Sequence, residues 1–121
     1  MNLIANGVVV LVALLHVYFL VLEMFLWTTP TGRRVFHTTE DFARASKALA
    51  ANQGLYNGFL AAALFWGVAL GPAGVGVRLF ALSCVVAAGL YGAATVNRRI
   101  LFVQGVPGLL GIALTMLARG T

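Results

Sequence analysis

Four long apolar runs dominate the chain, and polar residues gather in the short segments between them. The runs cover about residues 3–27, 48–70, 75–96 and 100–118. A membrane core about 30 Å thick needs roughly 20 helical residues to cross it, so each run is long enough to span. The pattern predicts an all-α fold. We expect one domain over residues 1–121, an integral membrane four-helix transmembrane bundle.

Residues 28–49 form the one substantial polar segment. Thr38 followed three residues later by Asp41 is typical of a helix start. Phe42, Ala45 and Leu49 then recur on one helical face. This segment predicts an amphipathic interfacial stretch over about residues 39–49 that continues into the second run.

Small residues and one proline predict how the helices pack. Gly54 and Gly58 are four apart, a spacing that lets membrane helices approach closely. Gly89 and Ala93 repeat this spacing in the third run. Pro107 inside the fourth run predicts a kink or an unpaired carbonyl near residue 103.

Composition strengthens the membrane assignment. The chain is 61% hydrophobic and only 9% charged, whereas soluble domains carry about 25% charged residues. The net charge is +5, but the basic residues stand at the ends of the apolar runs, so we expect no nucleic-acid partner. The lipid bilayer is the expected partner instead.

The distribution of basic residues predicts the orientation in the membrane. Six lie after the first and third runs: Arg33, Arg34, Arg44, Lys47, Arg98 and Arg99. Arg78 and Arg119 lie on the opposite side. The positive-inside rule then predicts a multi-pass protein of the cell inner membrane, with loops 28–49 and 97–99 in the cytoplasm and both termini outside.

Metal and cofactor chemistry find no support in the sequence. The single cysteine, Cys84, excludes an internal disulfide and a cysteine-based zinc site. His16 and His37 are too far apart to form a ligand motif. We expect no metal and no cofactor.

Polar side chains on all four runs fall at a similar depth, on the inferred cytoplasmic side. Successive runs cross the membrane in opposite directions. The ends of the first and third runs and the starts of the second and fourth runs therefore lie on the same side of the membrane. Such a cluster predicts a mixed polar and aromatic pocket. The candidate catalytic residues are His16 and Glu23. The candidate substrate-binding residues are Trp27, Asn52, Gln53, Tyr56, Asn57, Tyr91, Arg98 and Gln104.

Several of these stretches resemble a known family. They are HVYFLVLEMFLW from residue 16, TTPTGRRVF from 28, NQGLYNGFLAA from 52, GLYGAAT from 89 and VQGVPGLLG from 103. They are similar to the domain of unknown function 1304 (DUF1304) family of small bacterial and fungal membrane proteins. The resemblance implies four spans and a membrane location, and it implies no particular activity.

Three functional hypotheses remain open from the sequence. The leading one is a pocket that binds a small lipophilic molecule and, in its stronger form, converts it by proton-transfer isomerisation or cyclisation. His16 and Glu23 would then donate or accept protons, by analogy with other helical membrane enzymes. The second is a proton-coupled transporter acting as a homodimer. The third is a non-catalytic membrane interaction protein, so the sequence leaves the question of an enzyme undecided.

Overall fold

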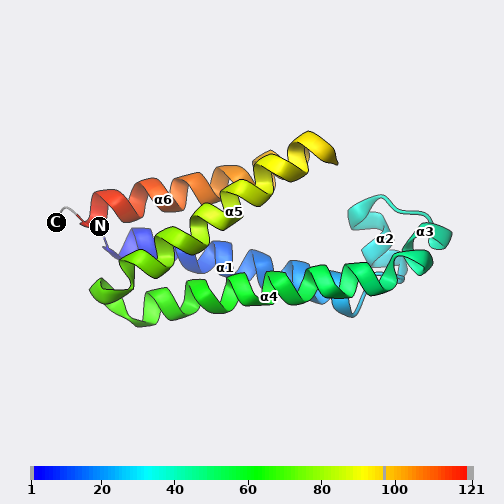
Figure 1. Cartoon of the computed structure of the whole chain (residues 1–121), viewed down its shortest axis with the longest axis horizontal. Helices are drawn as coiled ribbons and strands as arrows, with labels where there is room; N and C mark the ends of the chain where they lie inside the picture. The colour runs from blue at the N-terminus through cyan, green and yellow to red at the C-terminus, as the bar shows by residue number, and fades with distance from the viewer. Residues whose placement is uncertain (1, 97, 120–121) are drawn as a thin grey trace. The chain divides into compact units, whose positions relative to one another are not determined.

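The computed structural model describes residues 2–96 and 98–119, which form helices and turns without strands. Within this described part the α-helices are α1 (Asn2–Met24), α2 (Pro30–Phe36), α3 (Glu40–Ala45), α4 (Lys47–Ala69), α5 (Val75–Thr95) and α6 (Val106–Arg119) (Figure 1). A 3-10 turn, η1 (Gly71–Gly74), precedes α5, and a π-helical turn, η2 (Leu101–Gly105), precedes α6. The all-α prediction is confirmed. Asn97 of the predicted hairpin lies outside the described residues.

Three helical segments of the described chain are long and apolar enough to cross a membrane. They cover Leu3–Met24, Gly71–Thr95 and Leu101–Arg119. The helix α4 has 23 residues but is not among them. Its first half carries Asn52, Gln53 and Asn57, whose amides lower its hydropathy. Three of the four predicted spans therefore have a matching apolar helix, and a four-helix transmembrane bundle stays a prediction.

The residues group into two compact units, and α1 and α4 contribute to both. Unit 1 contains the described residues up to Leu14 and those from Leu60 onward. Unit 2 contains Leu15–Phe59. The core of unit 1 draws buried side chains from α1, α4 and α5, with Ile112 of α6 packed against them. These buried side chains are Val9, Val12, Ala13, Leu64, Ala81, Leu82 and Val85.

Glycines bring α6 close to α5 within unit 1. A methyl group built on Gly89 would lie 2.8 Å from the backbone nitrogen of Gly105. In α6 itself, a methyl group built on Gly108 would meet Val86, and a methyl group built on Gly111 would meet Leu82. The predicted role of small residues in helix packing is confirmed for α5 and α6, which lie side by side in Figure 1.

Pro107 distorts the helix that it was predicted to distort. Proline has no backbone N–H, so it cannot donate to the carbonyl four residues earlier. The chain accommodates this through the π-helical turn, in which Val106 N–H donates to the carbonyl of Leu101. The hydrogen bond of Val106, the residue before the proline, therefore reaches back five residues, one more than in an α-helix. Gln104 lies within this turn.

The end of α1 in unit 2 differs from the prediction. The first run was expected to remain helical to Trp27, but α1 ends at Met24. The chain then turns back, with Thr29 Oγ1 donating to the carbonyl of Leu26 at 2.6 Å and capping α2 by accepting from Gly32 N–H. Gly32 lies so close to the Leu26 carbonyl that a methyl group there would be only 2.0 Å from its oxygen. This packing stops the helix before Trp27.

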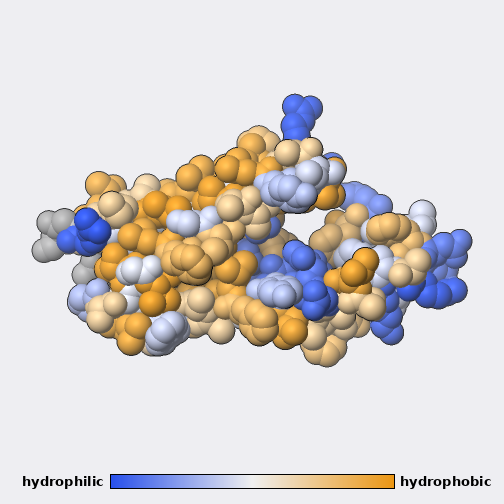
Figure 2. Space-filling model, in the orientation of Figure 1, coloured by the Kyte–Doolittle hydropathy of each residue, from blue (hydrophilic) through white to orange (hydrophobic). Residues whose placement is uncertain are grey.

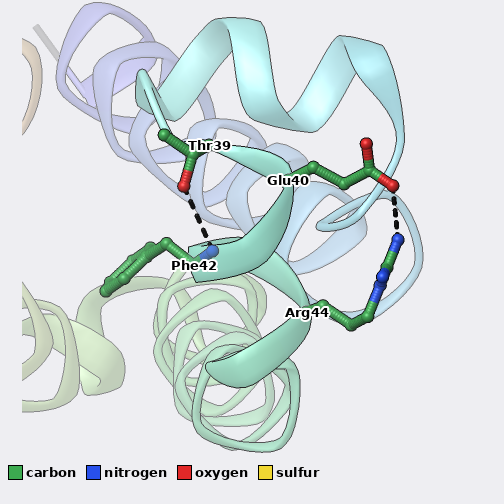
Figure 3. A network of polar contacts seen from close by, with 4 residues as sticks. All are labelled: Thr39, Glu40, Phe42 and Arg44. Carbon is green, nitrogen blue, oxygen red and sulfur yellow. Dashed lines mark hydrogen bonds and ion pairs between the residues drawn. The ribbon is translucent and has the colours of Figure 1, made fainter.

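The polar segment after α2 folds as a short separate helix. Thr39, rather than the expected Thr38, caps α3, and its Oγ1 accepts from the backbone N–H of Phe42 at 3.1 Å (Figure 3). Arg44 forms an exposed ion pair with Glu40 one turn earlier, as Figure 3 also shows. The helix ends at Ala45, and α4 begins at Lys47. The predicted stretch 39–49 is therefore divided between two helices.

Large apolar side chains are exposed on every long helix. Leu3, Leu11, Phe80 and Leu117 are among the most exposed of them. Figure 2 shows apolar residues over much of the visible surface of the long helices, whereas polar residues gather around α2 and α3. Exposed apolar area on this scale marks a surface that contacts lipid or protein.

The close approach of α5 and η2 can be tested with two alanine substitutions in one helix. Gly89→Ala should destabilise the protein by about 1–3 kcal/mol, because its methyl group meets backbone that cannot rotate away. Gly76→Ala is the matched control, since no atom lies within 4 Å of its added methyl group. Thermal unfolding in detergent micelles measures both. Equal midpoints for the two variants would contradict the packing.

Candidate functional site

Two glycines of α4 allow it to approach α1 inside unit 2. A methyl group built on Gly54 would lie 2.6 Å from Met24 Cγ and 3.2 Å from the carbonyl oxygen of Leu20. One built on Gly58 would lie 2.7 Å from the Leu20 side chain. The predicted glycine face is thus directed at α1. It brings the backbones of two helices together next to Glu23.

The same face of α4 carries the amide that pairs with Glu23. Asn57 Nδ2 donates a hydrogen bond to Glu23 Oε1 at 2.5 Å. Only 8% of Glu23 and 7% of Asn57 are exposed. Asn57 comes three residues after Gly54, so the two lie together on one helical face. Asn57 therefore lies on the same face of α4 as the glycines that pack against α1.

The Glu23–Asn57 pair still has polar atoms available for another molecule. Among the described residues Asn57 is the one hydrogen-bond partner of Glu23, so carboxylate Oε2 has none there. The amide oxygen Oδ1 of Asn57 likewise has no described partner. Each of these oxygens can accept a hydrogen bond. The pair can therefore recognise an N–H or O–H group.

His16 is fully buried in unit 2 but is distant from Glu23 along α1. The two residues are seven apart, which corresponds to a rise of about 10.5 Å. The ring of His16 contacts Phe19 edge-on, with 5.6 Å between the centroids. Their spacing of seven residues places His16 and Glu23 on one face of α1, yet this separation does not allow direct proton transfer between them.

Trp27 connects the segment that follows α1 with the start of α4 through a hydrogen bond. Its Nε1 donates to Ser46 Oγ at 3.1 Å, and its ring lies 4.9 Å from that of Phe36. Ser46 stands at the junction between α3 and α4 and also donates to the carbonyl of Phe42. These contacts give Trp27 a structural role in unit 2. A contact between Trp27 and a ligand stays a prediction.

Comparisons with known proteins identify the family. The model of a protein family of unknown function, DUF1304, matches residues 10–116. The chain belongs to the DUF1304 family. It is 33% identical over 104 residues to the uncharacterized protein YpaA of Lactococcus lactis subsp. lactis (strain IL1403), covering 84% of this chain and 87% of that protein. No solved structure matches the chain.

The other predicted ligand contacts from α4 face outward in this DUF1304 chain. Asn52 and Gln53 are exposed, and Tyr56 is 57% exposed with its ring edge-on to Phe59. Of the four polar residues predicted on this helix, the structure thus brings Asn57 alone to Glu23. A ligand role for the exposed three stays a prediction.

The remaining predicted residues belong to unit 1. Tyr91 is 73% exposed near the end of α5, and Arg98 is exposed just before η2. Gln104 lies partly buried within η2. Their convergence with Glu23 stays a prediction.

The sequence did not indicate every residue that shapes this site of the DUF1304 chain. Leu20 and Met24 form the surface against which the α4 glycines pack, and Ser46 holds Trp27. The first two follow from the helical spacing around Glu23. Nothing in the local sequence singles out Ser46, because its partner lies 19 residues away. Within the described residues no group of His, Cys, Asp or Glu could hold a metal ion.

A double-mutant cycle can measure the Glu23–Asn57 pair. Glu23→Ala and Asn57→Ala should show a coupling of about 1 kcal/mol, which lies between the mean of about 0.6 and the maximum of about 1.7 kcal/mol measured for polar pairs between membrane helices. Unfolding in detergent micelles supplies the four stabilities. The control cycle combines Glu23→Ala with Asn52→Ala, whose side chain is exposed. That cycle should be additive within about 0.5 kcal/mol, and equal coupling in both cycles would refute the pair.

Proposed function

We propose that this protein is a multi-pass membrane protein that binds a small lipophilic molecule through the Glu23–Asn57 pair. The observation that carries the proposal is a nearly buried carboxylate, hydrogen-bonded to an amide of a second helix, on a helix apolar enough to span a membrane. Acidic residues in such helices are costly and are retained at functional sites.

The membrane location rests on surface and composition together. Three helices are long and apolar enough to cross, and large apolar side chains are exposed along the long helices. In our proposal α4 is the fourth span, with its exposed amides near the cytoplasmic interface. Loops 28–49 and 97–99 would face the cytoplasm, and both termini would face outward, following the excess of arginine and lysine in those loops.

The chemistry of the pair sets the class of ligand. The acceptor oxygens Oε2 of Glu23 and Oδ1 of Asn57 fit a hydroxyl or amine group on an otherwise apolar molecule. The exposed aromatic rings of Tyr56 and Phe59 on α4 suit its apolar part. We therefore expect a ligand that is mostly apolar and carries one hydrogen-bond donor. Such a ligand matches a site that has few polar atoms and a surface accessible to lipid.

Chemical conversion of this ligand is the stronger form of the proposal. Glu23 would be the proton donor or acceptor, since His16 lies about 10.5 Å farther along α1. A substrate would have to bridge these two side chains for both to act on it. The geometry therefore favours binding as the primary activity, with Glu23 as the residue that decides it.

Ligand retention by the purified protein tests the proposal. The protein is extracted from its native membrane, and bound molecules are recorded by native mass spectrometry and identified after release. Glu23→Gln should lower the occupancy of the bound lipophilic molecule at least tenfold, because it replaces an acceptor oxygen by a donor. Glu40→Gln makes the same change at an exposed acid of α3 and should retain the wild-type occupancy.

Two results would contradict the binding function. One is the absence of any lipophilic molecule in the folded wild-type protein at native ligand levels. The other is equal occupancy in the wild type and in Glu23→Gln. Circular dichroism of each variant establishes that its helices are formed, so a loss of occupancy is assigned to the site and not to unfolding.

A further inference from the structure

Unit 1 contains a cavity that is separate from the Glu23–Asn57 pair. It is partly open, has a volume of about 350 Å³ and is formed by the start of α1, η1, the start of α5 and the end of α6. Figure 1 shows these segments together at one end of unit 1. Its polar lining comes from Asn6, Arg78, Thr115 and Arg119. Two of these four residues are cationic, so the polar part of a mainly apolar lining carries positive charge.

Arg78 is buried with much of its hydrogen-bonding capacity unused. It is 7% exposed, and Nη1 donates to the carbonyls of Gly67, at 2.5 Å, and Gly71, at 2.9 Å. These bonds hold the end of α4 and the turn that follows. Nε has no hydrogen-bond partner among the described residues, and neither has Nη2. Together Nε and Nη2 form a fork that matches two oxygens of an anion.

Thr115, another residue of the cavity lining, carries a second unsatisfied group. It is 3% exposed, and its Oγ1 has no hydrogen-bond partner among the described residues. A buried hydroxyl without a partner is destabilising by about 1–3 kcal/mol.

No carboxylate side chain in unit 1 balances Arg78. The acidic residues of the chain are Glu23, Glu40 and Asp41, and all three belong to unit 2. A buried charge without a counter-ion is strongly unfavourable. Arg78 therefore has no carboxylate side chain of its own unit as a counter-ion, and an anion from outside would supply one.

We propose that this cavity binds a phosphate group. The fork of Arg78 holds two phosphate oxygens, Thr115 Oγ1 donates to a third, and Arg119 at the rim adds positive charge. The volume corresponds to about twelve water molecules at roughly 30 Å³ each, which exceeds a bare phosphate ion. A phosphate that carries an organic substituent fits this volume better.

The position of the cavity points to a phospholipid headgroup as the source. Asn6 lies near the start of the first apolar segment, Gly71 begins the second, and Arg119 ends the third. The ends of membrane-spanning helices lie at the depth of lipid headgroups. A free phosphate ester shares the same chemistry, so the experiment compares both sources.

Binding of defined anions to delipidated protein tests the site. The protein is purified in a neutral detergent and titrated with phosphatidylglycerol, with diacylglycerol and with inorganic phosphate, while native mass spectrometry and thermal shift record binding. Phosphatidylglycerol should bind at least tenfold more tightly than diacylglycerol. Inorganic phosphate that binds alone and displaces the lipid would identify a site open to soluble phosphates. Binding of the lipid alone would identify a headgroup site, and either result supports the proposal.

Variants connect the binding to the cavity. Arg78→Lys keeps the charge but removes the fork, and should weaken phosphatidylglycerol binding at least tenfold. Thr115→Val has nearly the same shape and breaks no bond within the described residues, so it should fold and bind about three- to tenfold more weakly. Arg34→Gln removes an exposed arginine of unit 2 and should bind like the wild type.

The proposal is overturned if folded Thr115→Val and Arg78→Lys both bind phosphatidylglycerol as tightly as the wild type. It is also overturned if phosphatidylglycerol and diacylglycerol bind equally. Glu23→Gln should leave phosphatidylglycerol binding unchanged, which separates this site from the one proposed at the Glu23–Asn57 pair.

Discussion

The approach of α4 to α1 inside unit 2 is the constraint on which the Glu23 site depends. Gly54 and Gly58 have no side chain, so Leu20 and Met24 pack directly against the α4 backbone. At this separation the short amide of Asn57 reaches the carboxylate of Glu23. A larger residue at position 54 would move α4 outward and remove the partner of a nearly buried acid. Packing and polar chemistry therefore depend on the same two glycines.

Much of this site could be predicted from the sequence, because its elements are local. The spacing of Gly54 and Gly58 indicates a packing face, and an acid in an apolar run indicates a polar partner. The position of Trp27 beyond the end of α1 could not be predicted in this way. Helical periodicity places it on the face of Glu23, but α1 ends at Met24 since Gly32 returns to pack on Leu26. Contacts between segments several residues apart decide where that helix stops.

The burial of Arg78 is a second feature that the sequence does not predict. Near the start of an apolar run, an arginine is most simply interpreted as a charge that sets membrane orientation. The structure instead buries it and directs Nη1 to two carbonyls around the turn between α4 and α5. That turn brings Gly67 and Gly71 within reach of a side chain one helix later. One signal was present in the sequence, because residues 60–121 contain arginines but no acidic residue.

Two of the buried ionisable groups, Glu23 and Arg78, are stabilised in different ways, and this difference underlies the different partners proposed for them. Glu23 has an amide of its own unit as a donor, and its remaining acceptor oxygen suits a neutral or protonated ligand group. Arg78 has carbonyl acceptors but no carboxylate side chain in its unit to balance its charge. Carbonyl dipoles offset part of the cost of burying a cation, whereas an anion offsets its full charge. A chain with eight basic and three acidic residues cannot pair every cation internally. In a membrane the abundant anion is the lipid phosphate, and the phosphate site proposed at Arg78 would use that group as its counter-ion.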